Sequence, residues 1–167
     1  GSIKDLLKSN NLLCHSAHSS YESIDDYNNI IHRAKLLNIK HVIVPAPPKK
    51  KDGDFKNSFD INEQDWMSFG KKLSSYVSIF EDNGLTLGYH NHSYEFISLP
   101  SGKLPIECVM DQSENLKFEI DLGWTTAGGA DPNIWVERYA NKIIACHLKD
   151  FYFNDKDMLD HSNQSAV

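Results

Sequence analysis

The sequence predicts a single α/β domain built on a parallel sheet. Five short apolar segments have the length of strands, and stretches with helical spacing separate each segment from the next. Strands that alternate with helices in this way are typical of parallel sheets with crossover connections. The 167 residues, 40% of them hydrophobic, are sufficient for one core, so we expect a single domain over 3–167. The predicted strands are 12–18, 41–45, 85–92, 116–121 and 143–149.

Composition and charge argue against several classes of protein. The net charge is −6, from 23 acidic and 17 basic residues, and the only basic cluster is 49–51. A nucleic-acid-binding protein would carry a basic face, so we expect no nucleic-acid partner. No apolar run approaches the roughly 18 residues of a membrane-spanning helix, so we expect no membrane partner. The three cysteines, Cys14, Cys108 and Cys146, lack metal-binding spacing and are odd in number, which fits a cytoplasmic protein.

The first elements of the chain can be read from local signals. Residues 1–2, Gly-Ser, resemble the remnant of an expression tag, and we exclude them from the fold. Residues 3–10 are typical of the end of a helix, which suggests that a further segment came before it. After the strand 12–18, apolar residues three and four apart predict an amphipathic helix over 25–37, and the strand 41–45 follows.

The next stretch combines an irregular loop with a long helix. Residues 45–60 are rich in proline and lysine without periodicity, which predicts a mobile loop or an active-site lid. Asn62 is placed to cap the following helix, and Asp65 puts negative charge in its first turn. Gly84 is placed to end that helix. The aromatic residues at helical spacing between them are expected in the core, before the strand 85–92.

The chain from 117 to 150 reads as two strands joined by one helix, after a short helix around 104–111. Asp131 is placed to cap the joining helix, Pro132 suits its first turn, and the helix is expected to end near Asn141.

Polar side chains follow the predicted strands at their carboxyl ends. These ends share one edge of a parallel sheet, where ligands bind, so Asp121 and His147 should meet there. Strand alternation places Glu119 on the same face as Asp121. A carboxylate and an imidazole on neighbouring strand ends can ligate a divalent ion such as Mn²⁺, Co²⁺, Zn²⁺ or Mg²⁺. Each of these side chains alone also has a structural explanation, as a hydrogen-bonded core histidine or a helix cap.

Three ordered motifs resemble a known family. GYHNHSYEF, then FEIDLGW with the following GGADP, and ACHLKDF are similar to consecutive motifs of the xylose isomerase-like sugar phosphate isomerase/epimerase superfamily. That superfamily consists of (β/α)₈ TIM barrels, so the resemblance implies a partial TIM barrel. The five strands would correspond to the third to seventh, with the first, second and eighth missing, and the chain would be a fragment. In the family, a divalent metal is held by Glu, Asp, His and Glu on the last four strands, which implies Asp121 and His147 as ligands.

The sequence departs from the family pattern in two ways. No acid lies at 88–90, where the first glutamate is expected, so Glu95, His90 or His92 would have to serve as that ligand. The last glutamate belongs to the missing eighth strand.

The resemblance implies a metal-dependent isomerase or epimerase. Such an enzyme takes a proton from the carbon next to a carbonyl of a small sugar or sugar phosphate, through an enediolate. Glu95 would be a metal ligand or a base, and Lys149 would be catalytic or contact substrate oxygens. Residues implied at the substrate are His18, His90, His92 and Trp124.

Two alternatives remain open. The chain could be a barrel fragment without catalysis, which would form a homo-oligomer, expected to be a dimer, through the open sheet edges at 12–18 and 143–149. It could also be a lyase of the inosose-dehydratase type, which would use the same metal and the same proton abstraction.

Overall fold

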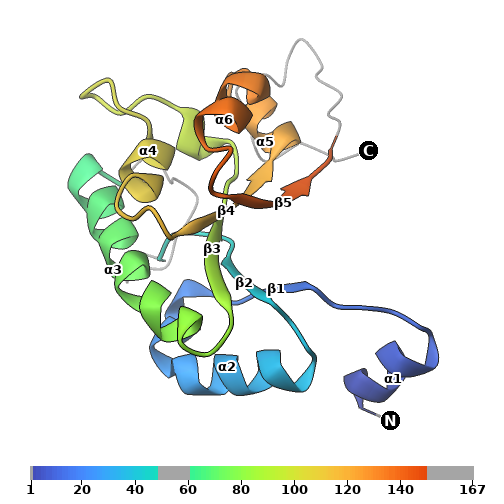
Figure 1. Cartoon of the computed structure of the whole chain (residues 1–167). Helices are drawn as coiled ribbons and strands as arrows, with labels where there is room; N and C mark the ends of the chain where they lie inside the picture. The colour runs from blue at the N-terminus through green and yellow to red at the C-terminus, as the bar shows by residue number, and fades with distance from the viewer. Residues whose placement is uncertain (1, 49–60, 150–167) are drawn as a thin grey trace.

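The protein contains one five-stranded parallel sheet in the order β1-β2-β3-β4-β5. The computed structural model describes residues 2–48 and 61–149. The sheet curls into half of a barrel, which confirms the expected partial TIM barrel (Figure 1). The strands are β1 Ser16–His18, β2 His41–Val44, β3 Thr86–His90, β4 Lys117–Asp121 and β5 Ile143–His147.

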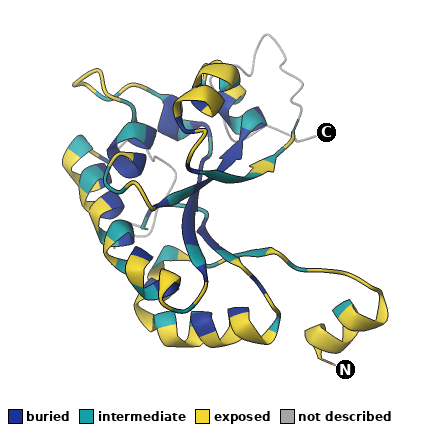
Figure 2. Cartoon of the chain, viewed as in Figure 1, coloured by how far each residue is buried: buried dark blue, intermediate teal, exposed yellow. Residues whose placement is uncertain are grey.

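Helices cover the outside of the curled sheet, and the buried residues lie between them and the strands (Figure 2). Two short 3-10 helices follow β1 and β3. The helices are α1 Ile3–Ser9, η1 Tyr21–Asp26, α2 Tyr27–Leu36, α3 Glu63–Glu81, η3 Tyr94–Phe96, α4 Pro105–Met110, α5 Leu122–Ala127 and α6 Pro132–Arg138.

The longest helix, α3, forms for the local reasons that its sequence contains. Asn62 caps it, accepting the N–H of Asp65, while the Asp65 carboxylate accepts the N–H of Asn62. Buried residues three, four and seven positions apart, including Trp66, Leu73 and Phe80, face the sheet. Gly84, with φ +72°, lies just beyond the end of the helix.

The connection between β4 and β5 differs from the sequence prediction, because it contains two helices instead of one. Asp121 ends β4 and caps α5 directly, accepting the N–H of Trp124 at 2.9 Å. Gly129, with φ +83°, then turns the chain into α6, which Asp131 caps as predicted. The second helix ends at Arg138, three residues before the predicted position.

Helix α1 lies away from the body of the molecule and buries no residue (Figure 1). Its N-cap is Ser2, which exchanges hydrogen bonds with Asp5, so a residue that we excluded from the fold contributes to a helix. None of the described helices is long and apolar enough to cross a membrane. The predicted loop or lid at 45–60 lies almost wholly outside the described residues, as do 150–167.

Candidate metal centre

The last residues of the parallel strands meet at one edge of the sheet. His18, His90, Asp121 and His147 are the final residues of β1, β3, β4 and β5. Asp121 is directly paired with His147 in the strand register, which confirms the expected proximity of these two residues. Glu119 lies two residues before Asp121 and therefore points to the same face. The inner face of the half-barrel thus carries three imidazoles and two carboxylates.

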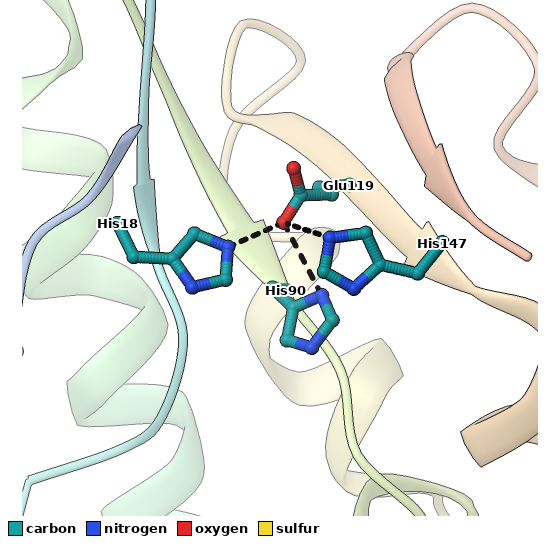
Figure 3. A group of neighbouring side chains, drawn as sticks. All are labelled: His18, His90, Glu119 and His147. Atoms are coloured by element: carbon teal, nitrogen blue, oxygen red, sulfur yellow. Dashed lines mark hydrogen bonds and ion pairs between the residues drawn. The ribbon is translucent and has the colours of Figure 1, made fainter. Parts of the chain in front are cut away.

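Glu119 is the centre of this group (Figure 3). Its Oε2 lies 2.6 Å from His18 Nε2, 3.4 Å from His90 Nδ1 and 3.4 Å from His147 Nε2. Each of the four residues offers one ligand atom, and these atoms all lie within 4.8 Å of one another. A His/Glu group of this kind could hold a metal ion. We call His18, His90, Glu119 and His147 the histidine cluster.

Asp121 lies on the other side of the same imidazoles. Its Oδ2 is 3.3 Å from His147 Nδ1 and 3.9 Å from His90 Nε2. The ammonium of Lys149 is 2.5 Å from the same oxygen. No contact to Oδ2 has the alignment of a hydrogen bond, although the side chain is fully buried. His90 and His147 therefore each lie between two carboxylates, with one ring nitrogen toward Glu119 and the other toward Asp121.

Burial and charge set the protonation of the site. Burial opposes ionisation of Glu119, but the hydrogen bond with His18 and the neighbouring imidazoles of His90 and His147 outweigh it and hold the pKa of this carboxyl well below its usual range. Burial lowers the pKa of His90, and it lowers the pKa of His92 to about 4. The buried imidazole of His90 and the partly buried imidazole of His92 are therefore neutral at neutral pH, and a neutral imidazole is the form that binds metals.

Three rings, those of His92, Tyr94 and Trp124, lie beside the histidine cluster, and we call them the aromatic wall. His92 stacks on Tyr94 with ring centroids 5.5 Å apart and lies 5.7 Å from the Trp124 ring. The Lys149 ammonium lies 5.3 Å from the centroid of Trp124. His90 joins this wall to the histidine cluster, with its centroid 5.1 Å from that of His92. The structure thus brings together every residue predicted at the site except Glu95.

Glu95 is engaged elsewhere. One of its carboxylate oxygens accepts a hydrogen bond from the Tyr89 hydroxyl, and the other accepts the N–H of His92 at 2.8 Å. The residue is fully buried, and burial raises the pKa of its carboxyl to about 8. Its role as a metal ligand or base stays a prediction, and these contacts do not favour it.

Glu119 is the residue that the sequence analysis did not assign to the site. The signal was present, because alternation along β4 already placed it beside Asp121. Its central position depends on the curl of the sheet, which brings His18 of β1 and His147 of β5 to within 5.9 Å between ring centroids.

Comparisons with known proteins agree with the half-barrel fold. A family model described as xylose isomerase-like TIM barrel matches residues 7–164. An inosose dehydratase of Clostridium perfringens is 26% identical over 98 residues, which are 58% of this chain and 32% of the relative. The chain thus spans about a third of the length of this curated relative.

Two solved structures share the fold. A sugar phosphate isomerase/epimerase from Parabacteroides distasonis superposes with a TM-score of 0.70 at 23% identity, covering 94% of this chain and 59% of that chain. The IOLI protein, whose structure contains a zinc atom, superposes with a TM-score of 0.68 at 14% identity, covering 98% of this chain and 62% of that chain.

Proposed function

Because the chain belongs to the xylose isomerase-like TIM-barrel family, we propose that it carries the metal centre of a divalent-metal-dependent sugar isomerase or epimerase. The reaction would take a proton from the carbon next to a carbonyl and pass through an enediolate. One observation carries the proposal: His90 and His147 lie between two buried carboxylates at the carboxyl ends of parallel strands. This end of a TIM barrel is where active sites are found.

The donor set fits a divalent ion. His90 and His147 would hold it together with one of the two carboxylates, Glu119 or Asp121, and His18 is a further nitrogen on the Glu119 side. A second carboxylate behind a metal-binding imidazole is the usual arrangement in metalloproteins, because it fixes the ring and its tautomer. The imidazole-rich set suits Zn²⁺ or Co²⁺ better than Mg²⁺. When bound, such an ion polarises a substrate carbonyl.

The chain's own residues would bind and orient the substrate. Trp124 and His92 offer aromatic rings against which a sugar can lie, beside the histidine cluster. Lys149 is partly exposed and is placed to bind a substrate oxygen or to move a proton. The substrate that we propose for these residues is a small sugar or sugar phosphate.

A lyase of the dehydratase type is the second candidate function, and the curated relative favours it. It begins with the same proton abstraction and continues with loss of water from the neighbouring carbon. The same residues serve both reactions up to that step.

We also propose that the chain forms a homodimer through its open edges. β1 and β5 each pair on one side only within the described sheet, and unpaired strand edges recruit other strands. Light scattering during size-exclusion chromatography tests this point. A monomer at all concentrations would contradict it, and would leave the metal centre unaffected.

Metal binding is the first test of the proposed function. Co²⁺ is titrated into the protein while visible absorption is recorded, with His147→Ala as the variant that removes a shared ligand. We expect saturable binding with one ion per chain and its loss in the variant. The absence of Co²⁺ and Zn²⁺ binding by the folded protein would refute the proposal.

Proton exchange separates the candidate reactions. The Zn²⁺-loaded protein is incubated in D₂O with ketoses, ketose phosphates and inososes, and the products are followed by proton NMR. An isomerase or epimerase incorporates deuterium next to the carbonyl without loss of water, whereas a dehydratase releases an unsaturated product. Neither change with any of these compounds would count against both catalytic proposals and favour the fragment without catalysis.

A further inference from the structure

Lys149 lies where a cation would bind Asp121. Its ammonium is 2.5 Å from Asp121 Oδ2, and the side chain is 28% exposed, whereas the carboxylate is fully buried. The other oxygen, Oδ1, is occupied because it accepts the N–H of Trp124. Oδ2 is thus the oxygen of Asp121 that remains for a ligand, and the structure places a positive charge against it.

We propose that Lys149 holds the place of a divalent ion in the metal-free protein, and that an ion bound to Asp121, His90 and His147 displaces it toward the substrate. The inference rests on the proposed function and adds one point to it. The new point is that the position of Lys149 depends on metal binding. That Asp121 is the carboxylate that binds the ion is what the family resemblance already implies.

The nitrogen atoms around Asp121 are compatible with an ion on this side. His147 Nδ1 lies 3.3 Å from Oδ2, and His90 Nε2 lies 3.9 Å from it. Two ligand atoms that share a metal at about 2.0–2.2 Å lie about 3–3.5 Å apart. The pair formed by His147 and Asp121 has that spacing, and so do the pairs that Glu119 forms with His90 and His147, so the spacing alone allows an ion on either side. Asp121 Oδ2 is buried without an aligned hydrogen bond, and so is His90 Nδ1 on the Glu119 side. What distinguishes Oδ2 is that a cation, the Lys149 ammonium, already lies against it.

Glu119, by contrast, has the position of a supporting carboxylate. Its Oε2 forms a hydrogen bond of 2.6 Å with His18, so it is already engaged. If His90 binds the ion through Nε2 and His147 binds it through Nδ1, each ring has one nitrogen left. These nitrogens, His90 Nδ1 and His147 Nε2, both lie 3.4 Å from Glu119 Oε2. Glu119 would therefore be a positioning residue that orients both metal-binding imidazoles.

Displacement gives Lys149 a defined second position. A divalent ion on Oδ2 repels an ammonium that contacts the same oxygen, so metal binding favours a position of Lys149 away from Asp121. The Lys149 ammonium already lies 5.3 Å from the centroid of the Trp124 ring. Once released, it is an unpaired cation beside the aromatic wall, so it would favour a substrate with an anionic group, a carboxylate or a phosphate.

Co²⁺ affinity in four variants tests the proposal. Lys149→Met removes the competing charge, and we expect it to tighten binding about tenfold or more, since like charges in contact are costly. Asp121→Asn should abolish tight binding. Glu119→Gln should weaken it about 10- to 100-fold. Lys103→Met is the matched control, because Lys103 forms a 2.6 Å pair with Glu63 at the surface, and it should bind Co²⁺ like the unmodified protein.

Chemical labelling reports the displacement directly. Acetylation of Lys149 by a limiting amine reagent is measured by mass spectrometry with and without Zn²⁺, relative to Lys103. We expect labelling of Lys149 to rise several-fold with Zn²⁺ while labelling of Lys103 does not change.

The outcomes separate this inference from the proposed function. One contradicting outcome is that Lys149→Met binds Co²⁺ no more tightly than the unmodified protein does, while His18→Ala abolishes binding. In that case the ion lies against Glu119, so the inference fails and the proposed metal centre is retained. Labelling of Lys149 that does not change with Zn²⁺ also overturns it. If neither the unmodified protein nor Lys149→Met binds Co²⁺ or Zn²⁺, the proposed function itself fails.

Discussion

Replacing Glu95 with glutamine should make the protein more stable at alkaline pH. Burial raises the pKa of Glu95 from 4.5 to about 8. Between these values the folded protein holds a proton that the unfolded chain has released, so the free energy of unfolding falls as the pH rises. Each unit of pKa difference corresponds to about 1.4 kcal/mol, which makes the full effect a few kcal/mol.

Glu95→Gln removes this dependence, because an amide of nearly the same shape stays neutral at every pH. Its oxygen can still accept a hydrogen bond from His92 N–H or from the Tyr89 hydroxyl. We therefore expect the variant and the unmodified protein to be equally stable near pH 5, and the variant to be more stable by a few kcal/mol near pH 9. Urea unfolding followed by circular dichroism at pH 5, 7 and 9 measures the difference.

Glu63→Gln is the matched control, because Glu63 is also a helix-associated glutamate but pairs at the surface with Lys103, and its pKa is lowered. This control should not gain stability between pH 5 and 9. If Glu95→Gln shows the same dependence on pH as the unmodified protein, the carboxyl is not held neutral by burial. If the variant also loses Co²⁺ binding, Glu95 is a ligand, as the family resemblance implies.

Three further predictions concern the fold. Lys142→Met should lower the free energy of unfolding by about 2–4 kcal/mol, because the buried ammonium donates to two backbone carbonyls at and beyond the end of α4, at 2.6 and 2.8 Å. Urea unfolding measures this loss, and Lys103→Met, which removes only an exposed pair, should lose much less stability. Equal losses in the two variants would contradict the role of Lys142. Gly70→Ala should destabilise by about 1–3 kcal/mol despite better helix propensity, since its Cβ would lie 2.8 Å from Val109 Cα; a rise in thermal midpoint would refute the close packing of α3 on α4. Asn62→Ala should cost about 1 kcal/mol through loss of the α3 cap, again in urea unfolding, and Asn62→Asp, which keeps the capping oxygen, should not.

Local patterns in the sequence determined which segments are strands and helices. Signals a few residues apart predict the parallel sheet, the cap at Asn62 and a stop of the long helix by Gly84. The structure confirms them, with α3 ending at Glu81 just before Gly84. The pairing of Asp121 with His147 was also predictable, because neighbouring parallel strands end at one edge of a sheet. The single joining helix was wrong, because Asp121 both ends a strand and caps a helix, and a strand-end acid does not show this from sequence alone.

Only the tertiary structure decided which side chains share the site. Glu119 became the centre because the curled sheet brings β1 and β5 toward each other, and no local pattern contains that curvature. Glu95 is close to the site in sequence, yet its carboxylate binds Tyr89 and the backbone of His92. Lys149 binds Asp121 because a buried carboxylate attracts a cation within reach of a flexible side chain. Secondary structure depends on neighbours along the chain, whereas each of these contacts depends on the distance between strands, and that distance exists only after folding.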